Sequence, residues 1–261
     1  MSQISKLFRD ARGIATVSGP GTALRWLGAA AVAAPQVLKR RNLLPADARM
    51  GEGPFAVRHR LGSAKLAGRG SFSGMREIWV RDCYTRGTDI LNVPDNALIV
   101  DLGSNIGNFT MLALAANPTA RVIAVEAGKD LAKTLESTAK LNGFGDRVTV
   151  CRALIGKVTK VQESMLDSSR YDDVKMVSEA EFLSRYAIER IDFLKCDIEG
   201  SEFAFLDPDS RLIDLADRIA IEIHGGAGDA HAFIAALEAK GFTMVDVVWD
   251  GDDCIALAKR R

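Results

Sequence analysis

The sequence contains few of the residues that build disulfide frameworks, zinc knuckles or redox motifs. Its four cysteines, Cys83, Cys151, Cys196 and Cys254, are far apart in 261 residues and form no Cys-x-x-Cys pair. This spacing excludes a zinc knuckle and a dithiol redox motif. Two of the cysteines lie in apolar, strand-like segments, where a free cysteine behaves as a small hydrophobic residue. Such usage is typical of a reducing compartment, and we therefore expect a cytoplasmic protein.

Long apolar segments are also absent. No run approaches the roughly 18 uninterrupted apolar residues that suggest a transmembrane helix. The stretch 27–34, which follows Arg25, is similar to the short core of a secretory signal peptide, so export is the alternative to the cytoplasmic expectation. A content of 48% hydrophobic and 26% charged residues is that of a globular protein and excludes the disordered and collagen-like classes.

The sequence carries no net charge, with 34 basic and 34 acidic residues. This balance argues against a general binder of polyanions, and no nucleic-acid partner is expected. The total conceals an asymmetry between the two parts of the chain. Residues 1–100 have a net charge of +8, and residues 101–261 have a net charge of −8. A split of this kind indicates different tasks for the two parts.

From residue 97 onward, apolar β-branched runs recur at regular intervals. The runs are Ala97–Val100, Val122–Val125, Val148–Cys151, Ile191–Cys196, Ile219–Ile223, Thr243–Trp249 and Cys254–Ala258. Helical patterns at 130–141 and 230–240 alternate with them, which predicts a doubly wound α/β fold with a parallel sheet. Only the acidic turn 250–253 separates the last two runs, so these strands must be antiparallel neighbours.

The remaining segments give weaker patterns. Short strands are predicted at Val158–Gln162 and Val174–Val177, and the capping box that begins at Ser178 predicts a helix through about Tyr186. Before the sheet, residues 4–15 and 22–43 have helical patterns.

The clearest local motif closes the first strand of the predicted sheet. It has the spacing D-x-G-x-N-x-G and runs from Asp101 through Gly103 and Asn105 to Gly107. Glycines in a strand-to-helix turn let backbone N–H groups approach a ligand. A dinucleotide loop has the spacing G-x-G-x-x-G instead. The acidic Asp101 would repel a pyrophosphate but suits a cationic ligand such as an α-amino group.

Further polar side chains follow the other strands at the same edge of the sheet. Glu126 comes directly after the second strand, where a carboxylate can bind both hydroxyls of a ribose. Asp197, Glu199 and Glu202 follow the fourth strand, and Lys195 can supply part of the positive charge that such a group of acids needs. The two glutamates also fit a simpler role as acids at a helix N-terminus.

A histidine follows the next strand. His224 precedes a Gly-Gly opening, where an imidazole is a natural general base near neutral pH. The alternative is a histidine that only forms hydrogen bonds within the fold.

Several of these segments together resemble the FkbM-type S-adenosylmethionine-dependent methyltransferases. The similarity rests on the glycine loop, on Asn142 in Leu-Asn-Gly, on the segment 192–202 and on the Glu-Ile-His step at 222–224. The segment 76–84 is similar to the family's entry into the first strand. The resemblance spans roughly residues 72–258, and the Asp-x-Glu-Gly-x-Glu run is its most specific motif.

The resemblance implies a class I methyltransferase fold. This is a Rossmann-like seven-stranded sheet with an antiparallel last strand and helices on both faces, here at residues 73–261. A basic helical extension, residues 1–72, lies outside the family pattern. The implied reaction is O-methylation of a hydroxyl, most often of a sugar in a glycan, glycolipid or natural product. S-Adenosylmethionine is the implied cofactor. Its implied contacts are Asp101, Gly103, Asn105 and Gly107 for the methionine part, Glu126 for the ribose, and Tyr84 beside them.

The residues leave the mechanism open. Asp197 is implied to face the active site, and Asp197 and His224 are the candidate bases for removing the hydroxyl proton. Alternatively, a divalent cation held by Asp197 would acidify the hydroxyl, and hard oxygen ligands would favour Mg²⁺. Lys195 completes the candidate catalytic group.

Other function classes agree less well with the sequence. An NAD-linked oxidoreductase is disfavoured by the glycine spacing and by the terminal hairpin. A nucleic-acid amino-methyltransferase would present Pro-Pro-aromatic after the fourth strand, where this chain has Asp197-Ile-Glu-Gly200. A binding module without turnover is the non-enzyme alternative.

The basic extension has several possible partners. Simple solvated surface is the plainest interpretation of its charge. We also consider a dock for an anionic acceptor, contact with an anionic membrane surface, and contact with a second copy of the chain.

Overall fold

A computed structural model describes residues 3–156 and 171–261. Its α-helices are α1 (Gln3–Ser18), α2 (Pro20–Val32), α3 (Ala34–Arg40), α4 (Leu44–Ala48), α5 (Ser71–Gly74), α6 (Asn108–Ala116), α7 (Lys129–Leu141), α9 (Glu179–Arg185) and α10 (Ala230–Ala239). Other helical turns are the π-helix η1 (Met75–Val80) and the 3₁₀ turns η2 (Gly145–Arg147) and η4 (Ser201–Leu206). The strands are β1 (Phe55–His59), β2 (Gly62–Leu66), β3 (Leu98–Leu102), β4 (Arg121–Val125), β5 (Val148–Cys151), β6 (Ala153–Ile155), β7 (Lys175–Val177), β8 (Phe193–Cys196), β9 (Arg218–Ile223), β10 (Phe242–Asp250) and β11 (Asp253–Arg260).

Among the described residues, seven strands form the main sheet in the order β10-β11-β9-β8-β3-β4-β5. The strands β3, β4, β5, β8 and β9 are parallel to their neighbours in this group. Strand β11 is antiparallel to both β9 and β10. The structure thus confirms the predicted doubly wound fold, the antiparallel last strand and the terminal hairpin.

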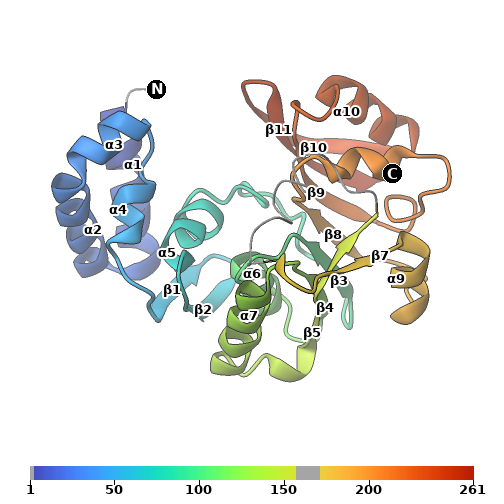
Figure 1. The fold of residues 1–261 in the computed structure, drawn as a ribbon, viewed down its shortest axis with the longest axis horizontal. Coiled ribbons are helices and arrows are strands. Elements are labelled where there is room, and N and C mark those ends of the chain that lie inside the picture. Colours follow the sequence, from blue (N-terminus) through green and yellow to red (C-terminus); the bar gives the residue numbers. More distant parts are fainter. Residues whose placement is uncertain (1–2, 157–170) are drawn as a thin grey trace.

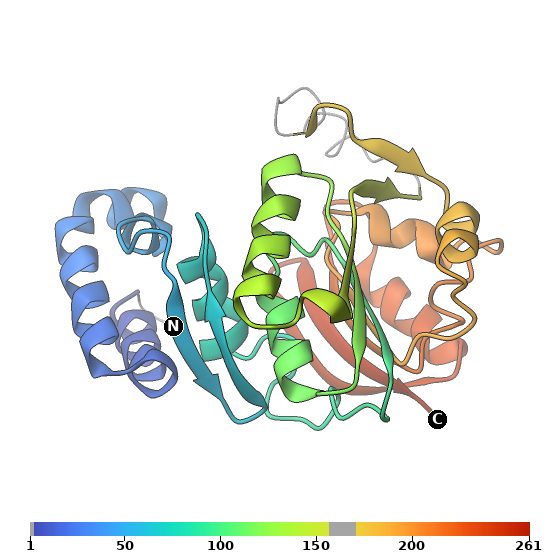
Figure 2. The same ribbon diagram turned by 90° about the horizontal axis from the view of Figure 1, so that it is seen from below.

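Two hydrophobic cores cover the two faces of the sheet. The first packs α6, α7 and the N-terminal elements against one face, and the second packs α9, α10 and η4 against the other (Figure 2). The strands are buried on both faces because they alternate between the cores: Ile219 and Ile221 belong to the second, and Ala220 to the first. This arrangement leaves the carboxyl ends of the parallel strands as the place for polar chemistry.

The helices α1, α2, α3 and α4 gather at one end of the molecule, and β1, β2 and α5 lie between them and the sheet (Figure 1). The first core nevertheless crosses residue 72, since it includes Trp26 of α2, Val57 of β1, Met75 of η1 and Phe109 of α6. The division at residues 72 and 73 stays a prediction, and one continuous core spans it.

Two N-terminal features differ from the sequence expectations. The helix predicted over 22–43 is interrupted at Ala33, and α3 begins with Pro35 in its first turn. Proline lacks the N–H donor and its ring clashes with the preceding turn, so a continuous helix cannot pass through it. The β1–β2 hairpin was not predicted, because only Phe55, Val57, Ala64 and Leu66 carry its apolar face.

The later segments agree with the sequence where they can be compared. Strand β7 matches the run predicted at 174–177. Helix α9 begins after Ser178, whose side chain accepts a hydrogen bond from the Glu181 N–H as in a capping box. The strand predicted at 158–162 lies outside the described residues. In the part of the chain that the structure covers, no helix is both long and apolar enough to cross a membrane.

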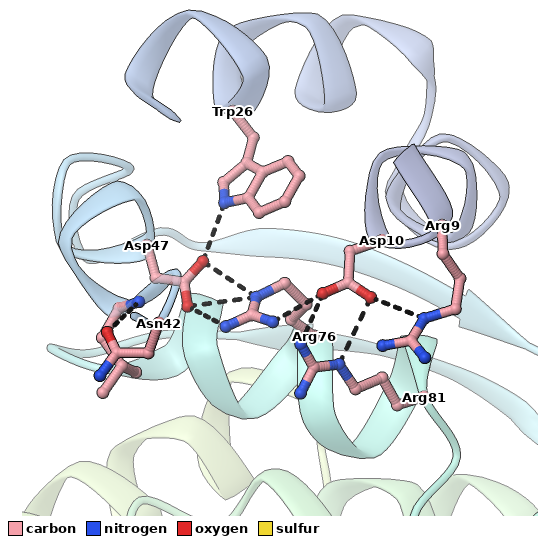
Figure 3. A network of polar contacts seen from close by, with 8 residues as sticks. Arg9, Asp10, Trp26, Asn42, Asp47, Arg76 and Arg81 are labelled. Atoms are coloured by element: carbon pink, nitrogen blue, oxygen red, sulfur yellow. Dashed lines mark hydrogen bonds and ion pairs between the residues drawn. The ribbon is translucent and has the colours of Figure 1, made fainter. Parts of the chain in front are cut away.

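A buried ion network joins the N-terminal helices to η1 (Figure 3). Arg76 of η1 donates from Nε and Nη2 to Asp47 and from Nη1 to Asp10, at 2.6 to 3.2 Å. Arg81 donates to Asp10 at 2.6 Å, and the indole of Trp26 donates to Asp47 at 2.8 Å. Asp10 and Asp47 are 0% and 4% exposed. Because each buried carboxylate depends on Arg76, the extension is fixed against the sheet domain.

Candidate active site

The candidate site lies where the strand order reverses, between β3 and β8. Chain connections run away from this point in both directions, which opens a crevice at the carboxyl ends of the strands. The predicted glycine loop follows β3 here, with Gly103, Asn105 and Gly107 at φ values of 69°, 51° and 86°. Asparagine tolerates this left-handed conformation better than most residues.

Gly103 has no room for a side chain. A Cβ atom at this position would overlap the backbone carbonyl oxygen of Asp197, which follows β8. The tight approach brings the ends of β3 and β8 together. Both the crowding by Asp197 and the positive φ therefore favour glycine at this position.

We expect Gly103→Ala to reduce the free energy of unfolding by about 3 kcal/mol, because left-handed strain and overpacking add. Gly143→Ala is the matched control, since Gly143 has a φ of 70° but nothing lies within 4 Å of the position that its Cβ atom would take. Gly143→Ala should lower the free energy of unfolding only by the left-handed strain, about 1–2 kcal/mol. Urea unfolding measures both, and equal losses would show that the contact with Asp197 is not tight.

Glu126 lies under the loop at the end of β4. One carboxylate oxygen accepts the Asn105 N–H at 2.8 Å, and the other accepts the Gly128 N–H at 2.6 Å. Burial raises the pKa of Glu126, although the two backbone hydrogen bonds oppose this shift. Each oxygen retains a lone pair, so the carboxylate can accept hydrogen bonds from two adjacent hydroxyls.

Two cavities meet at the loop. The first has a volume of about 280 Å³ and is lined by polar and apolar groups, among them Gly103, Asn105, Glu126, Leu131, Ile155 and Asp197. The second has a volume of about 150 Å³ and is lined by Gly103, Asn105 and Asp197 together with Glu77, Tyr84 and Lys195. The first cavity combines Glu126 with apolar walls, which fits a nucleoside. The second cavity leads from the first toward Glu77 and Asp197.

Asp101 occupies a different position from the rest of the predicted loop contacts. Its carboxylate is 0% exposed and accepts a hydrogen bond from Thr110 at 2.6 Å. Burial raises its pKa, against the opposing effect of Lys195. Asp101 lines neither cavity, and Gly107 opens α6 behind the loop. Contact of these two residues with a ligand stays a prediction.

Lys195 ties β8 to the glycine loop. Its ammonium group donates to the carbonyl oxygens of Leu102 and Gly103 at 3.2 and 2.8 Å. It lies 3.5 Å from Asp101 and 3.6 Å from Asp197. Burial alone would lower the pKa of Lys195, but the neighbouring carboxylates outweigh it and raise the pKa. Lys195 is therefore a fixed cation that positions the loop.

Tyr84 joins two carboxylates beyond Lys195. Its hydroxyl oxygen lies 3.0 Å from Asp197 and 3.1 Å from Glu222. One hydroxyl proton serves only one of these contacts, so the other requires a proton on a carboxyl group. Burial, followed by the charges of Asp197 and Glu77, raises the pKa of Glu222 to about 7. The group thus exchanges a proton near neutral pH.

Glu222 was not assigned a role from the sequence. The signal was present, because an acid in the middle of the apolar run Ile219–Ile223 is costly unless it has partners. The sequence prediction placed the general base at the next polar residue, His224. Glu77, which contributes to the same group of acids from η1, was likewise not singled out.

His224 is held by a buried glutamate. Its Nδ1 lies 3.0 Å from Glu202, and its backbone N–H donates to the same carboxylate oxygen at 2.8 Å. The hydrogen bond with Glu202 raises the pKa of His224 to about 9. The imidazole is then protonated at neutral pH, which disagrees with the role of general base that the sequence suggested. Glu202, for which a helix-terminal role was the simpler alternative from the sequence, positions this histidine.

Asp197, Glu199 and His224 form a group in which one ligand atom of each lies within 4.8 Å of the others. Mg²⁺ prefers oxygen ligands, and one of these three side chains offers an imidazole nitrogen instead. The group with His224 is therefore a poor Mg²⁺ site, and a cation held by Asp197 with nearby carboxylates stays a prediction.

A larger cleft of about 830 Å³ opens beside these cavities. Its floor includes Glu222 and Glu77, and Glu77 also lines the 150 Å³ cavity. One wall comes from α1, and the opposite wall comes from the β10–β11 hairpin. The acids thus stand between a nucleoside-sized cavity and a cleft large enough for a second molecule.

Comparison with known proteins agrees with this arrangement. Residues 101–244 match the Methyltransferase FkbM domain, and the chain belongs to this family. It is an S-adenosylmethionine-dependent methyltransferase. "Methyltransferase sdnD" of Sordaria araneosa is 27% identical over 232 residues, which cover 71% of this chain and 88% of that protein. "Methyltransferase 1" of Beauveria bassiana is 26% identical over 202 residues, which cover 65% of this chain and 80% of that protein.

Solved structures show a more distant similarity. A precorrin-6y C5,15-methyltransferase from Geobacter metallireducens has a TM-score of 0.43 and 12% identity, over 66% of this chain and 84% of that one.

Proposed function

We propose that this protein transfers a methyl group from S-adenosylmethionine to a hydroxyl of a sugar-containing acceptor. The observation that carries the proposal is the contact of Tyr84 with Asp197 and Glu222. Asp197 lines both small cavities, and Glu222 lines the large cleft. A proton acceptor therefore stands between the place for the donor and the place for an acceptor.

Different residues hold the methyl donor and remove the proton of the acceptor. When bound, S-adenosylmethionine supplies a methyl group on a sulfonium, whose sulfur keeps the electron pair of the broken bond. Glu126 and the loop with Gly103 and Asn105 would hold it. Glu222 accepts the proton of the attacking hydroxyl, because an alcohol is a poor nucleophile until its proton leaves. Tyr84 and Asp197 orient Glu222, and alignment of the two reactants supplies much of the rate.

A hydroxyl on a sugar suits the cleft because polar groups line much of it. Carboxylates come from residues such as Glu222, Asp250 and Asp253, and guanidinium groups come from residues such as Arg12 and Arg60. Such groups form hydrogen bonds with the many hydroxyls of a sugar. The proposed acceptor class rests on this lining and on the family resemblance.

The experiment is methyl transfer from isotopically labelled S-adenosylmethionine to a panel of sugars, sugar phosphates and glycolipids, followed by mass spectrometry and NMR of the products. We expect the label on a hydroxyl oxygen of at least one sugar-containing acceptor. Transfer only to nitrogen, carbon or a non-sugar acceptor would contradict the proposal.

We expect turnover of the best acceptor to remain within about twofold after treatment with EDTA and removal of the chelator. The reason is that the proton acceptor Glu222 needs no metal, and the group around His224 is a poor Mg²⁺ site. Initial rates with and without added Mg²⁺ measure this. Loss of activity that Mg²⁺ alone restores would favour the metal-assisted route through Asp197.

We also infer a reducing compartment. The four cysteines are all free and buried. Burial raises the pKa of Cys83 and of Cys196 well above the ordinary value, so these thiols are unreactive hydrophobic groups. This supports the cytoplasmic location expected from the sequence.

A further inference from the structure

The two long walls of the 830 Å³ cleft carry charges of opposite sign. The wall from α1 presents Arg9, Arg12 and Thr16, which recur at helical spacing on one side of the helix. The wall from the β10–β11 hairpin presents Asp250 and Asp253. A ligand between these elements therefore meets Arg9 and Arg12 of α1 and the carboxylates of the hairpin, although Asp10 and Arg86 also line the cleft.

The basic wall is fixed in place. A Cβ atom on Gly13 of α1 would overlap the side chain of Val80, so this helix lies directly on η1. Ile14 on the inner side of α1 is 0% exposed, and Asp10 is held by Arg76. Helix α1 is thus a rigid part of the cleft, although it belongs to the extension outside the family match.

The arginines of the buried network have acidic partners, whereas Arg12 beside them has none among the described residues. Arg9, Arg76 and Arg81 all contact the single carboxylate of Asp10, and Asp47 is the other carboxylate in the network. The charges of Arg81 and Arg76 also act on Glu77, so three positive charges face three negative ones. Within the described residues 3–156 and 171–261, the exposed side chain of Arg12 has no hydrogen-bond or ion-pair partner. A guanidinium group that lines a cleft and has no carboxylate partner favours an oxyanion.

We propose that the acceptor carries a phosphate-type oxyanion, which Arg12 binds at the α1 wall while its hydroxyl reaches Glu222. This inference rests on the proposed function and names its acceptor class as a sugar phosphate. Asp250 and Asp253 on the hairpin repel the anionic end of the acceptor, because like charges repel. The cleft therefore fixes the direction in which the acceptor lies as well as its charge.

Calorimetric titration of the chain saturated with S-adenosylhomocysteine tests the proposal with glucose, glucose 6-phosphate and inorganic phosphate as probes. We expect glucose 6-phosphate to bind at least about tenfold more tightly than glucose, and more weakly as salt concentration rises. Arg12→Glu should remove this preference. Arg58→Glu is the matched control, because Arg58 is exposed on β1 and does not line the cleft.

Titration with inorganic phosphate shows whether the preference for glucose 6-phosphate comes from the oxyanion itself or from the whole sugar phosphate. If it competes with glucose 6-phosphate in the wild type but not in Arg12→Glu, the oxyanion itself is recognised. Equal binding of glucose and glucose 6-phosphate, no binding of either phosphate probe, or an unchanged preference in Arg12→Glu would overturn the proposal. The titration with S-adenosylhomocysteine is measured first in every variant. If the wild type does not bind S-adenosylhomocysteine, the proposed function is contradicted. If it binds S-adenosylhomocysteine normally but shows no preference for glucose 6-phosphate over glucose, only this inference is contradicted.

Discussion

Glu222→Gln should lower kcat for methyl transfer by about 10²–10⁴-fold, the usual contribution of a positioned general base. The amide keeps the size of the side chain and can still form a hydrogen bond with the Tyr84 hydroxyl. It cannot accept the acceptor's proton. Because Glu222 lines the large cleft and not the 280 Å³ cavity, the affinity for S-adenosylhomocysteine should remain within about threefold of the wild type.

The pH dependence gives a second readout of the same residue. Glu222 of the free chain has a pKa of about 7 and must be ionised to accept a proton, so kcat/KM of the wild type should rise with pH and level off above this value. This inflection should be absent in Glu222→Gln. Glu238→Gln on the exposed side of α10 is the control, and we expect a wild-type profile for it.

Stability should change in the opposite direction from activity. The folded pKa of Glu222 is raised above the ordinary value of 4.5, so the folded chain binds more protons than the unfolded chain between about pH 4.5 and 7. Wild-type stability is then lost as pH rises through this window. Glu222→Gln should have a higher Tm than the wild type at pH 8 and the same Tm at pH 4. A wild-type kcat in Glu222→Gln, at any pH, would assign the proton to another acceptor such as Asp197.

Arg76→Ala should reduce the free energy of unfolding by about 3–5 kcal/mol, since it removes the shared partner of two buried carboxylates. Asp10 would keep Arg81, but Asp47 would keep only the Trp26 indole. That loss is a large fraction of the roughly 5–15 kcal/mol that stabilises a typical domain. Arg76→Lys should recover little, because an ammonium group cannot reproduce the three donors that Arg76 directs to Asp10 and Asp47.

Urea unfolding measures this effect, and Arg9→Ala is its control. The Arg9 side chain is 49% exposed, and an exposed pair with Asp10 should be worth less than about 1 kcal/mol. If Arg76→Ala fails to fold, the loss of unfolding free energy in Arg76→Lys still shows the direction and size of the effect. A loss below about 1 kcal/mol in both Arg76 variants would show that the network does not hold the extension in place.

Acid should weaken the same network. Burial alone would raise the pKa of Asp10, but Arg81 and Arg76 lower it below the ordinary value of 3.8. Its contribution to stability is therefore complete above that value and is lost as pH falls below it. The difference in Tm between the wild type and Arg76→Ala should narrow over that range.

The sheet could be predicted from the sequence because buried parallel strands are continuous apolar runs. All seven predicted runs, from Ala97–Val100 to Cys254–Ala258, correspond to strands of the main sheet. The short acidic turn before Asp253 was sufficient to predict the terminal hairpin. The N-terminal hairpin could not be predicted in this way, since its stability comes from packing against α1 and α6, far from it in the sequence.

The site could be predicted only where chemistry and strand ends coincide. Glu126, Asp197 and the glycine loop follow strands directly, so their meeting at one edge was foreseeable. The contact of Tyr84 with Glu222 links residues 138 positions apart and depends on how η1 packs on the sheet. The protonation of His224 depends on Glu202, which approaches it only in the folded chain.

The most direct test of the account is the transfer of a labelled methyl group from S-adenosylmethionine to glucose 6-phosphate or a related sugar phosphate, compared between the wild type and Glu222→Gln. The account predicts label on a hydroxyl oxygen with the wild type, and at least about 10²-fold slower transfer with the variant despite normal binding of S-adenosylhomocysteine. Equal rates in the two proteins, or label on an atom other than oxygen, would contradict it.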